Sequence, residues 1–413
     1  MSLRILLLIN RVPWPVKDGG TLAHYNLIKG LSEAGCDITL AAMNTSKHQV
    51  DVTKLPIAFT RLAKLHTAFV DNRVKAWPAF INLFTKQSYN IQRFINPAYR
   101  QILVDILTKQ QFDLVLFDGL YTAPYIDVVR KHSNAIIWLR QHNVEFKIWE
   151  TLANQTKQIL KKNYIKLLTK RLKKFEQQVL PKFDAIVALT QKDVTDMQAL
   201  GCKQPMFISP VGIDFKQTVG KIAVQLKSVF HLGAMDWQPN QQAMEWFVTQ
   251  VWPLVIKQEP DAIFYMAGKK MPITFKKYQN QNIKVMGEVD DATAFMQSKQ
   301  IMVVPLFAGS GIRVKILEGM SIGKAIVTTK LGVEGIEAQH QKHLMIADGA
   351  EAFAASIIEL LQNKDMSDQL GNEAKQLATD QYHNNKVIAQ LLNFYNTQQH
   401  TNLRCNLYTR NEF

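Results

Sequence analysis

The sequence has little cysteine, and it contains no long uninterrupted hydrophobic run. Its three cysteines, Cys36, Cys202 and Cys405, are odd in number and far apart, so they predict no disulfide framework or metal cluster and favour a reducing, cytoplasmic location. No run approaches the roughly 18 apolar residues of a membrane span. The apolar segment 5–9 is followed by Arg11, and it is predicted to be a buried strand rather than a signal peptide.

Several motifs with defined chemistry are also absent from the sequence. There is no Walker-type lysine loop, no paired-histidine metal motif, and no Ser–His–Asp or Cys–His set at a recognisable spacing. Signatures of nucleic-acid binding, such as zinc knuckles or paired aromatic strands, are missing as well. We therefore expect no metal, no bound cofactor and no nucleic-acid partner.

Acidic residues are outnumbered by basic ones. The chain has 413 residues and a formal net charge of +15, which predicts acidic partners such as phosphates or anionic lipid. The excess lies in the first half, within residues 61–100 and 151–184. A helix predicted over residues 151–182 carries apolar residues among its lysines. This pattern is typical of a helix on an anionic bilayer, and equally of a helix packed on its own domain with a solvated charged face.

Strand-like and helical patterns alternate along the chain, which predicts an α/β fold with parallel sheets and helices on both faces. The alternation breaks at residues 210–227, the predicted linker. It joins a first Rossmann-like domain, 1–209, to a second, 228–385, and a C-terminal helix and tail follow over 386–413. We expect two doubly wound domains with a cleft between them, where ligands bind beyond the carboxyl ends of the strands.

The most informative stretch is LFAGSGIRVKILEGMSIGKAIVTT, residues 306–329, which predicts a glycine loop and a helix between two buried strands. The glycines allow the backbone to approach a ligand closely, and the amides of the helix start favour an anion. Arg313 and Lys315 add positive charge, and the carboxylate of Glu318 shares a helix face with Lys315. A diphosphate with a ribose would fit; an ordinary charged surface helix is the alternative. The residues concerned are Gly309, Ser310, Gly311, Arg313, Lys315 and Glu318.

Two weaker patterns lie in the first domain. Gly19 and Gly20 stand between the first predicted strand and a helix, where backbone amides can meet a phosphate or a sugar. His142 follows the predicted strand AIIWL at its carboxyl end, on the edge that faces the expected cleft. A common glycine turn and a histidine that caps its strand are the respective alternatives.

Together these motifs resemble the retaining glycosyltransferases of family four (glycosyl transferases group one), which have the GT-B fold. The specific part is in the second half: VFHLGAMDWQPNQQAMEWFVTQVWP, FYMAGKKMP, KVMGEVDDATAFM and VVPLFAGSGIRVKILEGMSIGKAIVTTKLGVEGI resemble the donor domain. In the first half, PVKDGGTLAHYNLIKGLSEAGCDITLAA, RQHNVEFKIWE and AIVALTQKDVTDM resemble the acceptor domain.

The resemblance implies a nucleotide-sugar donor on the second domain and a glycan or lipid-linked acceptor on the first, in the synthesis of cell-surface polysaccharide or glycoconjugate. It implies a metal-independent reaction on the cytoplasmic side, with peripheral attachment to the inner face of the membrane. Implied catalytic residues are His142, Arg313 and Lys315. Implied donor-binding residues are Gly19, Gly20, Gly233, Gly268, Gly287, Gly309, Ser310, Gly311 and Glu318.

The sequence departs from the family pattern at two places. Glu318 matches the second glutamate of the family's pair, which holds the ribose, but the first falls at Ser310. The arginine and lysine that many members carry after the first donor-domain strand are missing from GAMDWQPN, and Arg313 and Lys315 resemble a substitute. A sugar-nucleotide epimerase is an alternative, although no convincing acid/base carboxylate pair is evident in the first domain. A non-catalytic sugar-nucleotide or glycan-binding protein is another, because of Ser310.

Overall fold

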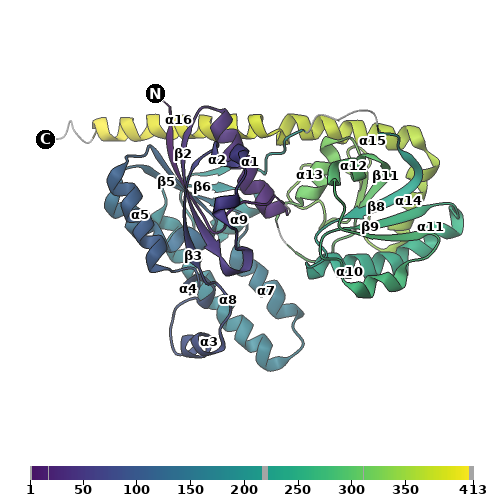
Figure 1. Ribbon diagram of the computed structural model, residues 1–413, viewed down its shortest axis with the longest axis horizontal. Helices are drawn as coiled ribbons and strands as arrows, with labels where there is room; N and C mark the ends of the chain where they lie inside the picture. The colour runs from purple at the N-terminus through teal and green to yellow at the C-terminus, as the bar shows by residue number, and fades with distance from the viewer. Residues whose placement is uncertain (1, 17, 216–221, 310, 409–413) are drawn as a thin grey trace. The chain divides into compact units, whose positions relative to one another are not determined.

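The computed structural model describes residues 2–16, 18–215, 222–309 and 311–408, with side chains up to residue 399. The chain forms two compact units (Figure 1). The first unit comprises residues 1–211 and 387–413, and the second comprises residues 212–386. The C-terminal helix α16 (Asn384–Tyr408) begins in the second unit and belongs to the first from Val387 onward.

The first unit is built on a seven-stranded sheet in the order β3-β2-β1-β4-β5-β6-β7, and all of its strand pairs are parallel. The strand order reverses between β1 and β4, so a crevice is expected beyond the carboxyl ends of these two strands. The strands are β1 (Arg4–Ile9), β2 (Asp37–Thr45), β3 (Lys64–Val70), β4 (Leu114–Asp118), β5 (Ile136–Gln141), β6 (Ala185–Ala188) and β7 (Met206–Ile208).

Helices cover both faces of this sheet because successive residues of its central strands point to opposite sides. Leu6 and Leu8 of β1 belong to one buried cluster, and Ile5 and Leu7 belong to the other. The first cluster includes side chains of α5, α6 and α8, and the second includes side chains of α1 and α16. The helices are α1 (Gly19–Glu33), α2 (Ile57–Thr60), α3 (Ala76–Leu83), α4 (Tyr89–Gln92), α5 (Pro97–Lys109), α6 (Ile126–His132), α7 (Glu145–Gln155), α8 (Ile159–Val179) and α9 (Gln191–Ala199).

Strand β3 was not predicted, and the predicted single helix over residues 151–182 is wrong. β3 lies at the sheet edge, and only Ala68 and Val70 are buried in it, so its sequence lacks a clear hydrophobic pattern. The basic segment forms two helices, α7 and α8, that pack against each other. α7 ends because Thr156 adopts an extended backbone and its hydroxyl donates to the Leu152 carbonyl oxygen at 2.7 Å.

The second unit contains a six-stranded parallel sheet in the order β10-β9-β8-β11-β12-β13. The order of the strands along the chain reverses between β8 and β11. Its strands are β8 (Gln225–Leu232), β9 (Ile263–Ala267), β10 (Ile283–Gly287), β11 (Lys299–Val304), β12 (Ala325–Thr328) and β13 (Met345–Ile346). Its helices are α10 (Gln238–Trp246), α11 (Trp252–Gln258), α12 (Ala292–Gln297), α13 (Val314–Ser321), α14 (Ala350–Gln362) and α15 (Lys364–Leu377). β8 starts at Gln225, inside the segment predicted as the linker. None of the described helices has both the length and the apolar content needed to cross a bilayer.

Candidate active site

A pocket of about 340 Å³ lies in the first unit, at the carboxyl ends of β1 and β4 where the strand order reverses. Gly20 and His142, which the sequence analysis singled out, both line it. Arg11, His24 and Asp118, which it did not single out, line it as well. The predicted edge of the first sheet is therefore hollowed, and the side chains around it come from segments far apart in the sequence.

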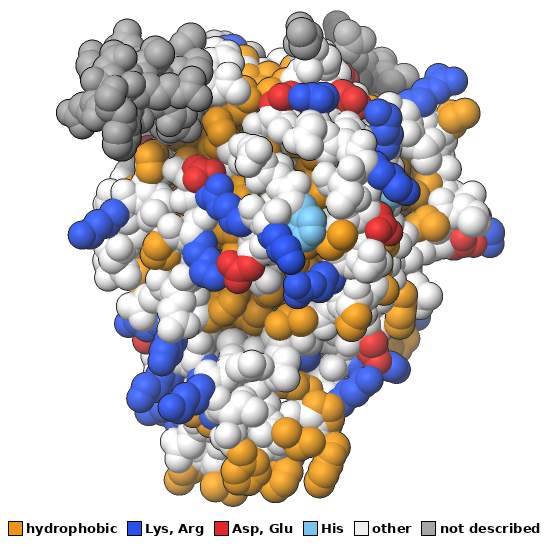
Figure 2. Space-filling view, turned by 90° about the vertical axis from the view of Figure 1, so that its left-hand side faces the viewer, with side chains coloured by type: hydrophobic (Ala, Val, Ile, Leu, Met, Phe, Trp, Pro, Cys, Tyr) orange, Lys and Arg blue, Asp and Glu red, His pale blue; other side chains and the backbone are white. Residues whose placement is uncertain are grey.

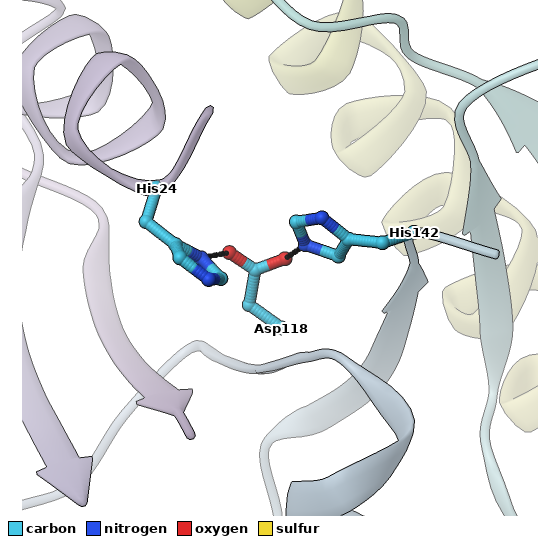
Figure 3. Close-up of side chains that lie close together, drawn as sticks. All are labelled: His24, Asp118 and His142. Carbon is cyan, nitrogen blue, oxygen red and sulfur yellow. Dashed lines mark hydrogen bonds and ion pairs between the residues drawn. The ribbon is translucent and has the colours of Figure 1, made fainter. Parts of the chain in front are cut away.

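Asp118, the last residue of β4, is the centre of a hydrogen-bonded cluster (Figure 3). Its carboxylate is fully buried and accepts from His24 Nδ1 at 2.6 Å and from His142 Nε2 at 2.5 Å. The two imidazoles lie on opposite sides of the carboxylate in Figure 3. Arg140, which is also buried, donates from Nη1 to Asp118 Oδ1 at 3.0 Å.

The charges in this cluster follow from burial and pairing. Burial raises the pKa of Asp118, but its interactions with His142 and with the Arg140 guanidinium outweigh burial and lower the pKa well below its usual range. Burial lowers the pKa of His24 to about 4, although Asp118 opposes this shift, so His24 is neutral at pH 7. An ionised carboxylate only accepts, so the network assigns a proton to His142 Nε2 and leaves its Nδ1 available to a ligand.

The ligand atoms of His24, Asp118 and His142 lie within 4.8 Å of one another, a spacing that a metal ion would accept. The Arg140 guanidinium, however, lies 3.0 Å from Asp118 Oδ1 and 3.3 Å from His142 Nε2. Its permanent positive charge in a buried site opposes a second cation at the same atoms. The residues therefore fit a charge-neutralised hydrogen-bonded cluster better than a metal centre.

The start of α1 explains why two glycines stand in this part of the chain. Asp18 caps the helix by accepting from the Thr21 amide at 2.9 Å, and it pairs with Arg11 at 2.8 Å. A Cβ on Gly20 would lie 2.1 Å from Arg11 Nη2, so only glycine allows the guanidinium to lie against the helix. Gly19 is the exposed first residue of α1.

Two carboxyl groups with raised pKa values lie beside the cluster. Burial raises the pKa of Glu145, which lines the pocket, to about 7, and the Tyr121 hydroxyl donates to it at 2.9 Å. Burial also raises the pKa of Glu176 to about 8, although Glu176 accepts from the amides of Glu145 and Phe146. Glu145 is therefore a group that exchanges a proton near neutral pH.

In the second unit, the stretch after β11 forms the predicted glycine loop and helix, and β12 follows. Arg313 directly precedes the first residue of α13, where its side chain makes no capping hydrogen bond, and it is 5% exposed. Its Nη1 donates to the Gly311 carbonyl, and its guanidinium lies 6.0 Å from the centre of the Trp237 ring. Burial lowers the pKa of Arg313. Ser310 lies outside the described residues.

Lys315 lies in the first turn of α13 among polar partners from β8 and α10. Its Nζ donates to Asn240 Oδ1 at 2.9 Å and lies 3.4 Å from His231 Nε2. His231 donates from Nδ1 to the Val303 carbonyl, and burial keeps its pKa well below the usual range, so its Nε2 faces the lysine as an acceptor. Burial and the Arg313 charge lower the pKa of Lys315 to about 7, against the opposing effect of Glu318.

The glycines at the strand ends allow the loops to approach Lys315 and each other. A Cβ on Gly233 would lie 2.6 Å from Lys315 Nζ, and one on Gly268 would lie 1.7 Å from the Gly233 carbonyl oxygen. Gly309 has a φ of 111° and lies against the Trp237 ring. Gly287 has a φ of 70°, a conformation that favours glycine. The structure thus gives three of these glycines a packing role and Gly287 a backbone role.

The sequence analysis missed Asp118, His24 and Arg140 in the first unit, and Trp237, His231 and Asn240 in the second. A signal for Asp118 was available, because the acid directly ends the buried strand LVLFD, as His142 directly follows β5. His24 had no comparable signal, since it lies within a helix 94 positions from its partner.

Part of the second unit, and the chain as a whole, resemble known proteins. Residues 227–363, the segment that contains Arg313, Lys315 and Glu318, match the family model described as "Glycosyl transferases group 1". A Klebsiella pneumoniae protein described as "Uncharacterized 44.6 kDa protein in cps region" is 24% identical over 409 residues, which cover 94% of this chain and 98% of that protein.

Several solved structures share the fold over almost the whole chain. Sucrose-phosphate synthase from Thermosynechococcus elongatus superposes with a TM-score of 0.69 at 13% identity, over 96% of this chain and 100% of that chain. Anabaena HepE in complex with UDP and glucose superposes with a TM-score of 0.66 at 12% identity, over 96% of this chain and 100% of that chain. TarM, a Staphylococcus aureus protein, superposes with a TM-score of 0.67 at 12% identity, over 96% of this chain and 99% of that chain. The likeness confirms the predicted fold: the chain has the GT-B architecture of two Rossmann-like domains.

Proposed function

We propose that this protein is a retaining glycosyltransferase of family four that transfers a sugar from a nucleoside-diphosphate sugar to a glycan or lipid-linked acceptor. The observation that carries the proposal is the pair of cations at the start of α13, buried Arg313 and half-buried Lys315, inside the segment that matches the glycosyltransferase model. HepE, which binds UDP and UDP-glucose, supports a nucleotide-sugar donor. The relative from a cps region supports a role in polysaccharide biosynthesis.

The two cations suit a diphosphate because both are poorly hydrated: Arg313 is buried and Lys315 is half-buried. Burial lowers the pKa of Arg313 and of Lys315, so the free protein bears a cost for their charge. A diphosphate recovers that cost, and its negative charge grows as the glycosidic bond breaks, so these cations stabilise the transition state more than the ground state. Glu318 accepts from the ribose hydroxyls, and the amides near Gly309 and Gly311 contact the phosphates. No metal is then required.

In the first unit, the pocket holds the acceptor, and His142 meets the donor sugar. Because His142 Nε2 donates to Asp118, its Nδ1 accepts from a sugar hydroxyl. Retention follows from attack on the face that the diphosphate leaves, with a leaving phosphate oxygen taking the acceptor's proton. The oxygen–sugar bond forms as the phosphate–sugar bond breaks, and no carboxylate nucleophile is needed.

We place the protein in the cytoplasm, attached peripherally to the inner face of the membrane. The low cysteine content and the excess of basic residues in the first half of the chain support this location.

A thermal-shift panel with UDP, GDP, ADP and CMP tests donor binding. The correct nucleotide at about 100 times its dissociation constant should add roughly 2.7 kcal/mol to the free energy of unfolding. A labelled sugar nucleotide of that base, incubated with candidate acceptors, then tests transfer. Binding without any product would favour a non-catalytic sugar-nucleotide-binding protein, and binding of no nucleotide would contradict the proposal.

One observation favours a second candidate, a sugar-nucleotide epimerase. The pocket contains Glu145 and Asp118, although no such carboxylate pair was evident from the sequence. The pKa of Glu145, raised by burial to about 7, suits a group that removes or returns a proton. NMR of the donor incubated without an acceptor separates the two activities, because only an epimerase would change the sugar's configuration while the diphosphate bond stays intact.

A further inference from the structure

Helix α3 and the residues next to it expose an apolar surface on the first unit. Trp77 is 70% exposed and Phe84 is 79% exposed, and Phe80 between them contacts both rings, with centroids 5.8 Å and 5.5 Å away. Patches of large apolar side chains on a protein surface mark interaction sites. We call this surface the α3 face; it consists of Val74, Trp77, Phe80, Ile81, Leu83 and Phe84.

The fold holds α3 by its polar side. Asn82 is buried, and its side-chain amide donates to Gln92 Oε1 at 2.9 Å. Arg171 of α8 donates to Asn82 Oδ1 and to the Leu83 carbonyl oxygen, both at 2.9 Å. The apolar residues 77, 80, 81 and 84 recur at helical spacing on the outward side. Asn82, the polar residue of α3, is buried while the large apolar side chains of the helix are exposed, so α3 presents hydrophobic side chains to the solvent.

Positive charge surrounds the α3 face. Figure 2 shows hydrophobic side chains gathered at the bottom of the view, at the height where Figure 1 draws α3, with Lys and Arg side chains on both sides. Lys86 follows the helix directly, and exposed lysines line α8, the helix that holds α3. Within the described residues, Lys86, Lys161, Lys166 and Lys170 form no ion pair with a carboxylate.

We propose that the α3 face inserts into the interfacial region of an anionic bilayer, with the neighbouring lysines on the lipid phosphates. Exposed aromatic rings suit the boundary between headgroups and acyl chains, and basic residues near an anionic surface strengthen the attraction to it. A protein partner of matching shape would not require the unpaired lysines. The proposal names the surface that carries the membrane attachment of the proposed function, and its test measures binding rather than transfer.

Flotation of the full chain with vesicles tests this proposal. Wild type should float with vesicles of phosphatidylcholine and about 30% phosphatidylglycerol, and much less with phosphatidylcholine alone, since the lysines need anionic headgroups. The variant W77S/F80S/F84S should have a partition coefficient about tenfold or more below that of wild type, because it lacks the three aromatic rings that would insert into the bilayer. K166E/K170E should weaken binding to anionic vesicles only. Undiminished flotation of the triple variant, or equal binding of wild type to neutral vesicles, would overturn the proposal.

Two controls keep the test independent of folding and of the proposed function. Ile57→Ser and Ile273→Ser remove other exposed apolar side chains, at 67% and 72% exposure, and should float like wild type. The triple variant should keep the wild-type thermal shift with the nucleotide, because the cation pair lies in the other unit. Sedimentation velocity tests whether the α3 face binds a second copy of the chain instead. If wild type forms a dimer but does not bind vesicles, and the triple variant is a monomer, the α3 face is a dimer interface and the proposal is wrong.

Discussion

The two units present the same edge of the same kind of sheet, yet they treat buried charge in opposite ways. In the first unit a buried carboxylate, Asp118, holds Arg140 and two histidines at hydrogen-bond distance. In the second unit Arg313 is buried and Lys315 is half-buried, and desolvation lowers the pKa of each. The first cluster is neutralised by its own residues and is ready to position a neutral sugar. The second bears a cost that an anionic ligand would recover, so under the proposed function the same architecture would suit two kinds of ligand.

The comparison predicts its largest effect at Arg313. Arg313→Ala should lower turnover by on the order of 100- to 1000-fold, because the charge that it meets grows in the transition state. Arg313→Lys should recover only part, since lysine lacks the planar fork that grips two oxygens. Steady-state kinetics measure both, and circular dichroism checks that the variants fold. Near-normal turnover of Arg313→Ala would move the role to another cation.

Asp118→Asn should produce the next largest effect, a decrease in the free energy of unfolding. Removal of one partner from a buried ion pair costs about 3–5 kcal/mol, because Arg140 then keeps a buried, uncompensated charge. Urea unfolding followed by fluorescence gives the shift. Asp113→Asn is the matched control, since Asp113 pairs with Arg4 at 3.1 Å on the surface and should change stability by about 1 kcal/mol or less. Equal effects at the two positions would show that the buried cluster carries no special stability.

Lys315 predicts a pH dependence of donor affinity. Its pKa of about 7 means that the free lysine is largely neutral above pH 7 and takes up a proton when the diphosphate binds. Affinity should therefore fall as pH rises above 7, by up to about tenfold per pH unit. Without a ligand the folded state favours the neutral lysine, so this group's contribution to stability rises between pH 7 and the ordinary pKa of 10.5.

Calorimetry in buffers of different ionisation enthalpy measures the proton uptake directly. Lys315→Met should abolish the uptake. Lys324→Met is the matched control: burial lowers the pKa of Lys324 to about 8, but its Nζ donates to the carbonyls of Gln297 and Lys299. The control should keep the wild-type uptake; if it does not, Lys315 is not the titrating group.

Chelation should have the smallest effect, since the two cations meet the diphosphate and Arg140 opposes a metal at Asp118. EDTA is expected to leave transfer activity unchanged. Activity lost to EDTA and restored by a divalent ion would contradict this, and metal binding by wild type but not by His24→Gln would place the ion in the first unit.

Regular features were predictable from sequence because their patterns are local. Buried strands followed by glycines and amphipathic helices predicted two parallel sheets, and the segment from β11 to β12 has the predicted elements in the predicted order. The edge strand β3 was not predicted because only two of its seven residues, Ala68 and Val70, are buried, so its sequence has no clear alternation of apolar and polar residues. The break between α7 and α8 was not predicted because a lysine-rich pattern continues across it.

The sequence by itself determined the fold class and the placing of Arg313, Lys315 and Glu318 on one helix, because spacing along a helix is a local property. Only the tertiary structure decided which side chains meet. It joined His24, Asp118 and His142 across 94 and 24 positions, set His231 and Asn240 beside Lys315, and turned the apolar side of α3 outward. The physical reason is that charge neutralisation and burial depend on neighbours from other strands, and a linear pattern does not record them.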